Sequence, residues 1–552
     1  MTAADLIARL ADFAATLAGL VFLWWRGKAL LLYFQQEEYD APRFRRWFRQ
    51  NHAYDRRASL IALAGIALIL VARMAKITLP AAAPSLLMAL AALEGARLSR
   101  RLVLGAKKPL VMTARAKRLF RLTLLIGVLT LLFSAVVFEA RSPEAAPLLV
   151  LLVIAQGIPW MLLIAHGLLL PHERRVNARF RAEAVETLAR LDPFVIGITG
   201  SFGKTSTKSL LAHILGSVAP TLATPGSVNT EMGITRIVRE TLRPEHRWFV
   251  VEMGAYGPGS IARLCRLAPP KLAIVTAVGD AHYERFKSLE TVYAAKFEIV
   301  DSTLSQGGEA IVVADAIPKE MLAHRLREPG SERILPVGSM DDPGLFLRLV
   351  SVLEERDGLR IVIRSRTFGE ATLKVPVFGR HQAENILAAT AAALRLGIPI
   401  ETIRAALASA PQTRHRLEVI RKGGITIIDD AYNSNPRGFA SALALLDLQV
   451  APGGRRILIT PGMVELGARH EAEHGRLGAL AARHVDIALI VTPARIVRFV
   501  AAYRAERPEP GALMTFERQA EAEAWIAAHA RPGDAILYEN NLPDLYERRP
   551  RF

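Results

Sequence analysis

The sequence predicts a multi-domain fold: an N-terminal α-helical transmembrane region, an α/β central domain with a phosphate-binding loop, and a smaller Rossmann-like α/β domain. The chain has 552 residues, of which 51% are hydrophobic, and a mean hydropathy of +0.24. Long apolar stretches occur only before residue 171, whereas short apolar runs alternate with helical patterns after residue 181. The expected boundaries are 1–180 for the membrane region, 190–415 for the central domain and 419–552 for the last domain.

The membrane region contains five apolar stretches of unequal quality. Because a span needs about 20 apolar residues, the fourth and fifth stretches make good spans. The second ends with Arg73 and Lys76, which can reach the membrane interface, and the third is short and rich in alanine. Five spans with the N-terminus outside is one arrangement; four spans, with one of the first three stretches only interfacial, is the alternative. The stretches are Leu6–Trp25, Leu60–Leu79, Ala81–Leu93, Leu122–Phe138 and Leu148–Leu170.

Basic residues gather between these stretches. Residues 1–180 hold 24 Lys/Arg against 10 Asp/Glu and so carry +14 of the net charge of +18. Cytoplasmic loops of membrane proteins collect such residues, so the pattern favours a membrane protein over a nucleic-acid-binding one and places everything after Pro171 in the cytoplasm. The start of the chain lacks a basic n-region and a cleavage site, which predicts no removable signal peptide. The single cysteine, Cys265, excludes an intramolecular disulfide.

A glycine-rich turn between a strand and a helix predicts the nucleotide site. The apolar run Phe194–Ile198 is typical of a buried strand, and Ser206–Leu215 of a helix. Residues 199–205 between them read Thr-Gly-Ser-Phe-Gly-Lys-Thr, a variant of the phosphate-loop pattern with Ile198 in place of its first glycine. In such a loop, backbone N–H groups face phosphate, the lysine reaches the β- and γ-phosphates, and the threonine ligates Mg²⁺. The predicted nucleotide-binding residues here are Gly200, Ser201, Gly203, Lys204, Thr205 and Ser206.

Further strand–helix units follow in both α/β domains. The alternation predicts doubly wound parallel sheets, which bind ligands at the carboxyl ends of their strands. Glu252 ends one expected strand and His282 follows another, so both are candidate Mg²⁺ ligands. The expected strands are Trp248–Met253, Leu272–Val278 and Ala310–Ala314 in the central domain, and Ile425–Asp430, Arg456–Thr460, Ile487–Val491 and Ala535–Tyr538 in the last. The expected helices lie near Glu231–Glu240, Ser260–Leu267, Leu289–Thr303, Arg437–Leu448, Glu471–His484, Pro493–Arg504 and Glu517–Ala530.

Five sequence blocks resemble the Mur ligases of peptidoglycan synthesis, and most of all the branch that adds D-alanyl-D-alanine to a UDP-muramoyl-tripeptide. Their order and spacing fit that family across roughly Asp192–Leu480. The resemblance implies a central ATP-binding Mur ligase domain and a mobile C-terminal domain that binds the incoming amine. The blocks are Gly197–Ser206 (GITGSFGKTS), Val251–Ala255 (VEMGA), Ala281-His282 with Ala295–Glu298 (AKFE), Gly379–Asn385 (GRHQAEN) and Asp429–Pro436 (DDAYNSNP).

The resemblance also implies roles for single residues. Lys204 is similar to the lysine that contacts phosphate, and Thr205 to a Mg²⁺ ligand. Lys296 stands where the family has a lysine, often carbamylated, that helps to hold a second Mg²⁺; a salt-bridged helix lysine is the alternative. The expected catalytic residues are Lys204, Glu252, His282 and Lys296, and the expected metal ligands are Thr205, Glu252, His282 and Lys296. The other implied contacts are Asn385 with the adenine region, Arg416 with the ATP phosphates, Asp430 with ribose, and Tyr432, Asn433 and Asn435 with the acceptor and phosphate side.

Two departures from the family bear on the substrates. The family's N-terminal UDP-sugar-binding domain is missing, and the apolar helices and basic loops of residues 1–180 stand in its place. The segment Tyr538–Tyr546 (YENNLPDLY) replaces a Lys-Gly-Ser-Arg type segment. Because a membrane enzyme without the UDP-binding domain can meet its substrate in the bilayer, a lipid-linked carboxylate substrate is a hypothesis that follows.

The expected activity is ATP-dependent joining of a carboxylate to an amino-acid or dipeptide amine through an acyl phosphate. Two Mg²⁺ ions, membrane lipid as a partner, and no nucleic acid are expected. The expected place is the bacterial cytoplasmic membrane, with several spans, cytoplasmic catalytic domains and a role in cell-envelope precursor synthesis.

Three alternatives stay open at this point. The first is a membrane transporter or sensor powered by the phosphate loop, but no charged residue lies inside the fourth or fifth apolar stretch, and no Walker B aspartate is evident. The second is an inactive scaffold that binds nucleotide. The third is a ligase of the same superfamily with a lipid-linked, folate or polyglutamate-type substrate, although the Asp429–Pro436 block favours the peptidoglycan branch.

Overall fold

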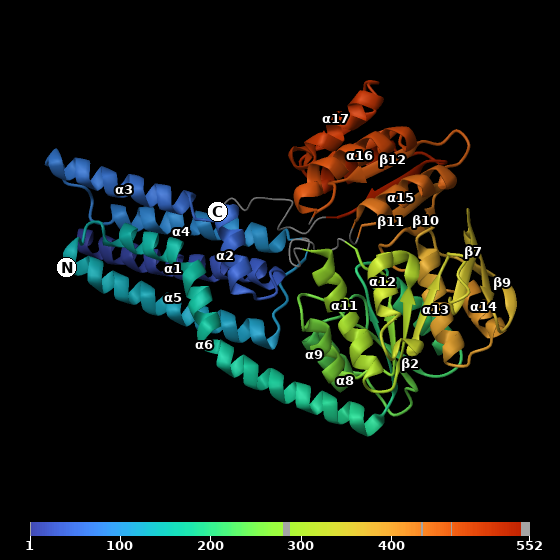
Figure 1. Ribbon diagram of the computed structural model, residues 1–552. Coiled ribbons are helices and arrows are strands. Elements are labelled where there is room, and N and C mark those ends of the chain that lie inside the picture. Colours follow the sequence, from blue (N-terminus) through green and yellow to red (C-terminus); the bar gives the residue numbers. More distant parts are fainter. Residues whose placement is uncertain (1, 107, 280–287, 432–433, 465, 542–552) are drawn as a thin grey trace. The chain divides into compact units, whose positions relative to one another are not determined.

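The computed structural model describes residues 2–106, 108–279, 288–431, 434–464 and 466–541. The chain divides into two compact units, a helical one that contains the N-terminal residues up to Val176 and an α/β one that covers Asn177–Asn541. Figure 1 shows the helices of the first unit in blue to teal and the two sheets of the second in green to red.

The helical unit follows the expected apolar stretches but its helices extend further. Among the described residues, four helices are long and apolar enough to cross a membrane: α1 (Ala3–Gln36), α3 (Arg57–Met74), α5 (Ala114–Arg141) and α6 (Ala146–Leu191). The third stretch forms α4 (Ala83–Leu104), which is not among these four and carries Glu94 and Arg97. The first and fifth apolar stretches end near Trp25 and Leu170, whereas α1 continues to Gln36 and α6 continues through Pro171 to Leu191. A short helix, α2 (Ala41–Gln50), fills part of the first basic linker.

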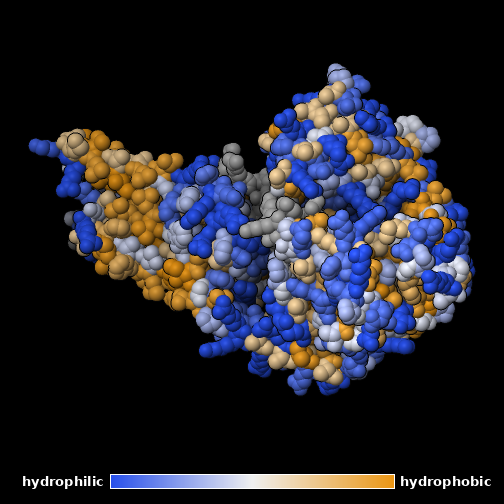
Figure 2. Space-filling model, in the orientation of Figure 1, coloured by the Kyte–Doolittle hydropathy of each residue, from blue (hydrophilic) through white to orange (hydrophobic). Residues whose placement is uncertain are grey.

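Small residues let the helices of this unit pack closely. A Cβ atom at Gly95 of α4 would lie 2.5 Å from the ring of Phe22, and one at Gly127 of α5 would lie 2.6 Å from Leu23. Such close approaches are typical of helix contacts in membranes. Large apolar side chains cover the outside instead, and Figure 2 shows this hydrophobic surface in orange. Examples of these exposed side chains are Phe13, Leu60, Leu68, Leu129 and Phe133.

A buried ion pair joins three of these helices. The guanidinium of Arg26 on α1 donates to the carboxylate of Asp55, and both side chains are almost fully buried. Asp55 also accepts the backbone N–H of Ser59, in the first turn of α3, at 3.1 Å. Gln156 of α6 donates to the Asp55 carbonyl at 2.7 Å. Because a buried charge needs a partner, this cluster fixes α1, α3 and α6 relative to one another.

The central domain is the doubly wound sheet that the sequence predicts, with an unpredicted antiparallel extension. Its nine strands lie in the order β2-β3-β1-β4-β5-β6-β7-β8-β9, and all neighbours up to β7 are parallel. The expected strands correspond to β1 (Phe194–Thr199), β3 (Trp248–Glu252), β4 (Leu272–Val275) and β5 (Glu309–Val313). The unexpected strands are β2 (Thr221–Ala223), β6 (Ile334–Gly338), β7 (Leu347–Glu355), β8 (Gly358–Ser365) and β9 (Gly369–Val375).

Helices cover both faces of this sheet. On one face, α7 (Lys204–Gly216), α13 (Gln382–Arg395) and α14 (Ile400–Ala408) pack on inward side chains such as Ile196 and Ile198. On the other, α8 (Glu231–Glu240), α9 (Ser260–Leu267) and α11 (Leu289–Leu304) pack in one core with Val195, to which α12 (Lys319–Arg325) adds Leu322. The carboxyl ends of β1, β3 and β4 therefore open at one edge of the sheet, beside the start of α7.

The C-terminal domain is a second, smaller α/β sheet of six strands, in the order β10-β11-β15-β12-β13-β14. The four expected strands are confirmed as β11 (Ile425–Asp430), β12 (Arg456–Thr460), β13 (Ile487–Val491) and β15 (Ala535–Glu539). Two edge strands, β10 (Glu418–Lys422) and β14 (Leu513–Phe516), were not expected. Three helices pack on one face and α18 (Gln519–His529) on the other. The three are α15 (Pro436–Gln449), α16 (His470–His484) and α17 (Val497–Glu506).

Candidate active site

The predicted phosphate loop lies between β1 and α7 in a conformation that requires glycine. Gly200 has φ +154° and Gly203 has φ +80°. A Cβ atom at Gly200 would lie 2.0 Å from Thr276 Oγ1, and one at Gly203 would lie 2.1 Å from Asn385 Oδ1. Side chains other than hydrogen therefore cannot occupy these two positions without moving the loop. The turn ends at the first residue of α7, Lys204, so the helix N-terminus opens toward the loop.

Lys204 folds back over the loop that precedes it. Its ammonium donates to the Gly200 carbonyl at 2.7 Å. Burial lowers the pKa of Lys204 to about 8, the nearby carboxylate of Glu252 opposes that shift, and the positive charge of Arg416 adds to it. An arriving phosphate would supply the negative charge that this buried ammonium lacks.

Glu252, at the carboxyl end of β3, is the centre of a buried polar cluster. Its carboxylate accepts from Thr205 Oγ1 at 2.9 Å, from Lys208 Nζ at 3.0 Å and from Asn229 Nδ2 at 3.1 Å. The structure thus brings together Thr205 and Glu252, as the sequence predicts. Lys208 and Asn229 were missed; Lys208 lies one turn beyond Lys204 on the same face of α7, which is the signal that could have found it. Burial lowers the pKa of Lys208 as well.

The paired hydroxyl and carboxylate oxygens of Thr205 and Glu252 fit a hard divalent cation. Mg²⁺ prefers oxygen ligands and usually binds through one or two protein groups together with phosphate oxygens. The two side chains already meet at hydrogen-bonding distance, Thr205 from the start of α7 and Glu252 from the end of β3. The third expected ligand, His282, lies outside the described residues.

Lys296 of α11 is buried, at 3% exposure, without a carboxylate partner in the described part of the chain. Burial lowers the pKa of its amine well below the usual value, and the positive charge of Lys204 lowers it further. The salt-bridged alternative for Lys296 therefore has no support among the described contacts. Glu298, in the same sequence block, accepts the backbone N–H groups of Gly259 and Ala262 and so holds the start of α9.

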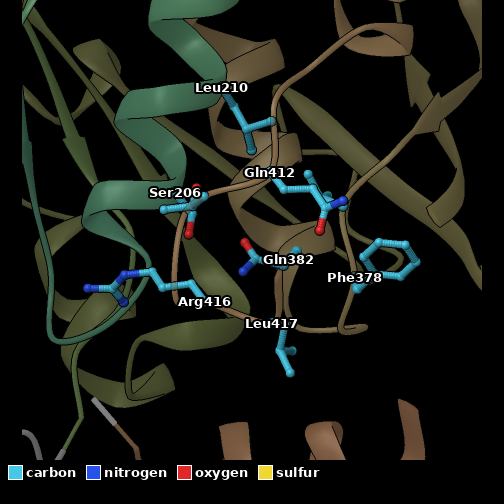
Figure 3. A pocket seen from close by; sticks show the side chains of 9 residues that line it. Ser206, Leu210, Phe378, Gln382, Gln412, Arg416 and Leu417 are labelled. Atoms are coloured by element: carbon cyan, nitrogen blue, oxygen red, sulfur yellow. The ribbon is translucent and has the colours of Figure 1, made fainter. Parts of the chain in front are cut away.

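A pocket lies beside the phosphate loop, between α7, α13 and the segment that leads into the C-terminal domain (Figure 3). Its wall combines the amides of Gln382 and Gln412 with apolar groups, including the ring of Phe378. Arg416 lines it too. Asn385 does not line this pocket: its Oδ1 accepts from Thr207 and its Nδ2 donates to Gln382, so it supports the loop from behind. The full lining is Ser206, Leu210, Val377, Phe378, Gln382, Gln412, Thr413, Arg416 and Leu417.

Two carboxyl groups meet at the carboxyl edge of the C-terminal sheet. Asp430 ends β11 and pairs in register with Glu539, which ends β15. Asp430 accepts the Leu417 N–H at 3.1 Å, and burial raises its pKa to about 7. Glu539 accepts from the hydroxyl of Ser434, while its second oxygen has no hydrogen-bond partner among the described residues. Burial and the charge of Asp430 raise the pKa of Glu539 well above its usual value.

Glu539 was not predicted as a site residue, although it belongs to the segment Tyr538–Tyr546 that departs from the family.

Three further residues were predicted to line the acceptor and phosphate side, and the structure describes one of them. Tyr432 and Asn433 lie outside the described residues. The side chain of Asn435 accepts the Gly438 N–H at 2.9 Å and so caps α15, which makes a helix cap its described role.

Comparison with known proteins agrees with this geometry. The Mur ligase middle domain matches residues 198–393, and the Mur ligase glutamate ligase domain matches residues 415–539. A UDP-N-acetylmuramoyl-tripeptide–D-alanyl-D-alanine ligase from Mycobacterium tuberculosis is 34% identical over 363 residues, which cover 62% of this chain and 69% of that protein. The chain belongs to the Mur ligase family. It is an ATP-dependent ligase of the MurF type.

Other relatives of this Mur ligase extend the comparison. The Bacillus subtilis ligase of the same name is 29% identical, and the match covers 64% of this chain and 74% of that protein. The MurF structure from Acinetobacter baumannii aligns with a TM-score of 0.56 at 28% identity, over 66% of this chain and 77% of its own. The MurF structure from Thermotoga maritima in complex with ADP aligns with a TM-score of 0.55 at 25% identity, over 68% and 82%. Mur ligases use ATP and Mg²⁺, as the sequence resemblance implies.

The contact between Gly203 and Asn385 makes a sharp prediction about the loop. We expect Gly203→Ala to weaken ATP binding by at least about 10-fold, because the new methyl group would collide with Asn385 in a backbone conformation that already disfavours it. Gly216→Ala is the matched control, since nothing lies within 4 Å of the added methyl group at the other end of the same helix. Isothermal titration with ATP would measure both; equal affinities in the two variants would contradict the structural account of the loop.

The lowered pKa of Lys204 predicts proton uptake when ATP binds. With a pKa of about 8, half of the lysines are neutral at pH 8, and more are neutral as the pH rises. Phosphate favours the charged amine, so binding at pH 8.5 should take up a large fraction of a proton, and affinity should fall as pH rises through 8. Titration calorimetry in buffers of different ionisation enthalpy would measure the uptake. The arginine of Lys204→Arg stays charged, so this variant should lose the proton uptake. The same uptake in the wild type and in Lys204→Arg would mean that another group takes up the proton.

Proposed function

We propose that this Mur ligase joins the free carboxylate of a muramoyl-tripeptide precursor to the amine of D-alanyl-D-alanine in peptidoglycan synthesis. The substrates are those in the names of its relatives. The observation that carries the proposal is the buried cluster of Lys204, Thr205 and Glu252 in a chain whose two α/β domains both match Mur ligase domains.

In this mechanism the carboxylate attacks the γ-phosphate of ATP, forming an acyl phosphate and ADP. The amine then attacks the carbonyl carbon, and phosphate and a proton leave. Lys204 and the loop N–H groups hold the β- and γ-phosphates and offset the charge that develops on them. Thr205 and Glu252, together with His282, would hold one Mg²⁺. Bound Mg²⁺ neutralises phosphate charge and orients the reacting oxygens.

Lys296 is proposed to hold a second Mg²⁺ as a carbamate. Carbamylation adds CO₂ to the neutral amine, releases a proton, and converts a cation into an oxygen ligand. The burial of Lys296 without a carboxylate partner among its described neighbours supports this role, because a buried ammonium there would be unbalanced. The positive charge of Lys204 near it would attract the carbamate.

The nucleotide is proposed to occupy the pocket beside α7. The amides of Gln382 and Gln412 offer donors and acceptors to the edge of an adenine ring, and Phe378 offers an apolar face. Arg416 would face the phosphates, and Asp430 the ribose. This proposal keeps Arg416 and Asp430 in the roles that the sequence implies and moves the adenine contact from Asn385 to Gln382.

The helical unit is proposed to anchor the enzyme in the bacterial cytoplasmic membrane, with the catalytic domains in the cytoplasm. Four helices that fit a membrane by length and composition, and the basic linkers at one end of them, support this placement. Neither Mur ligase match includes residues before 198. We therefore propose that the muramoyl substrate is lipid-linked and reaches the enzyme in the bilayer.

Phosphate release from ATP by the detergent-solubilised full chain tests this function. The reactions would contain UDP-muramoyl-tripeptide or its lipid-linked form, each with and without D-alanyl-D-alanine. We expect turnover only with both substrates, faster with the lipid-linked form, and at least about 100-fold slower in Lys204→Ala. ATP turnover that does not depend on either substrate would contradict the proposed ligase function. Full activity with the UDP form in the absence of lipid would exclude the proposal of a lipid-linked substrate.

A further inference from the structure

Helix α2 is a ten-residue amphipathic helix fixed to the helical unit through aromatic side chains. Its buried residues are Phe44, Trp47 and Phe48. The Trp47 ring stacks on Tyr33 with centroids 4.4 Å apart, and the Phe44 ring lies 5.1 Å from Phe34. Ten residues are too few to span a bilayer, so α2 must lie at or outside its surface.

The opposite side of α2 carries three exposed arginines, Arg45, Arg46 and Arg49, which we name the α2 arginine face. Arg49 lies three residues after Arg46 and four after Arg45, and such spacings place side chains on one side of a helix. None of the three side chains makes an ion pair or hydrogen bond with another described residue. Their neighbours differ: Arg43 pairs with Glu37 and Glu38, Arg57 and Arg97 share Glu94, and Arg118 pairs with Glu173.

Aromatic residues mark the level of the membrane surface on α1. Lys28 lies over the rings of Trp24 and Trp25, at 4.6 and 5.3 Å, and Arg100 lies 5.6 Å from Trp25. Tryptophan beside cationic side chains is typical of the boundary between hydrocarbon and headgroups. The eleven residues of α1 beyond Trp25 extend about 16 Å past this boundary, and the headgroup layer is about 5–8 Å thick.

Helix α2 crosses the far end of α1 and does not run along it. Phe44 contacts Phe34 and Trp47 contacts Tyr33, so three residues of α2 correspond to one residue of α1. These contacts lie eight and nine residues, or about 12–14 Å, past Trp25. The long side chains of the α2 arginine face can extend back toward the membrane, so that their guanidinium groups reach the headgroup region of a membrane-inserted chain.

We propose that the α2 arginine face binds the phosphate headgroups of anionic phospholipids at the cytoplasmic surface. The inference rests on the membrane insertion proposed above. Guanidinium groups bind phosphate oxygens in pairs, and arginines that lack a carboxylate partner are available to do so. Each basic residue near an anionic surface raises affinity about fivefold. A bound lipid layer on α2 would hold the first basic linker flat against the membrane.

The test uses the full chain in phosphatidylcholine bilayers with trace spin-labelled phosphatidylglycerol. The fraction of label immobilised by the protein gives its preference for phosphatidylglycerol over labelled phosphatidylcholine. The variant is Arg45→Gln/Arg46→Gln/Arg49→Gln. The matched control, Arg73→Gln/Lys76→Gln/Arg141→Gln, removes three cations at the C-terminal ends of α3 and α5, which lie at the opposite end of the helices.

We expect the preference for phosphatidylglycerol to fall at least tenfold in the α2 variant and less than twofold in the control. Equal effects in both variants, or no effect in either, would overturn the proposal. Loss of the preference on addition of millimolar inorganic phosphate would overturn it as well, because the site would then serve a soluble anion. Co-flotation with vesicles and phosphate release are measured in parallel: a protein that does not float disproves membrane insertion, whereas an inserted, active protein with an unchanged lipid preference disproves only this inference.

Discussion

The tight turn between β1 and α7 is the constraint on which the rest of the site depends. Gly200 and Gly203 let the backbone pass directly against Thr276 and Asn385, so the loop has no room for other side chains. The turn places the start of α7 at the carboxyl edge of the sheet, where Lys204 and the backbone N–H groups face the same space. Thr205 follows immediately and reaches Glu252 at the end of β3. A short segment of backbone thereby positions, at the same time, the groups proposed to bind phosphate and Mg²⁺.

The electrostatics of this site prepare it for a highly charged nucleotide. Lys208 and Lys296 are buried and Lys204 is half-buried. Lys204 acts on Lys296 through its charge, and Arg416 acts on Lys204 and Lys208. The carboxylate of Glu252 accepts a hydrogen bond from Lys208. Excess positive charge in a poorly solvated place is unfavourable, and burial lowers the pKa of each lysine for that reason. Binding of a polyphosphate with Mg²⁺ would balance this positive charge. The folded protein thus holds its cationic groups in place before the nucleotide arrives.

Local sequence patterns predicted the elements whose residues are contiguous in the chain, but not the contacts between distant elements. The strand, glycine turn and helix at residues 194–216 are contiguous, and so their order and positions were predicted from the sequence. Lys208, Asn229 and Glu539 were missed because their partners come from elements far apart in the sequence, through the register of β1 with β3 and of β11 with β15. The hairpins β7–β9 were missed although alternate residues such as Leu359, Ile361 and Ile363 point into the core, which is the period-two signal of a half-buried strand.

The lengths of the helices in the first unit show a second limit of prediction from sequence. Apolar composition ends at Trp25 in the first stretch, but the helix has no reason to end there, because Leu30–Phe34 find apolar partners within the helical unit. Likewise α6 continues through Pro171, since the residues around it keep helical backbone on both sides. Hydropathy therefore locates segments that fit a bilayer, whereas tertiary packing decides where their helices end.

The central claim is that this chain activates a carboxylate by phosphorylation at the Lys204 loop. The most direct test follows oxygen: the muramoyl-tripeptide substrate is labelled with ¹⁸O in its reacting carboxylate, and the phosphate released during ligation to D-alanyl-D-alanine is analysed by ³¹P NMR. An acyl phosphate predicts that each phosphate carries one oxygen from that carboxylate. Unlabelled phosphate would mean that water, not the carboxylate, attacks ATP, and would contradict the account.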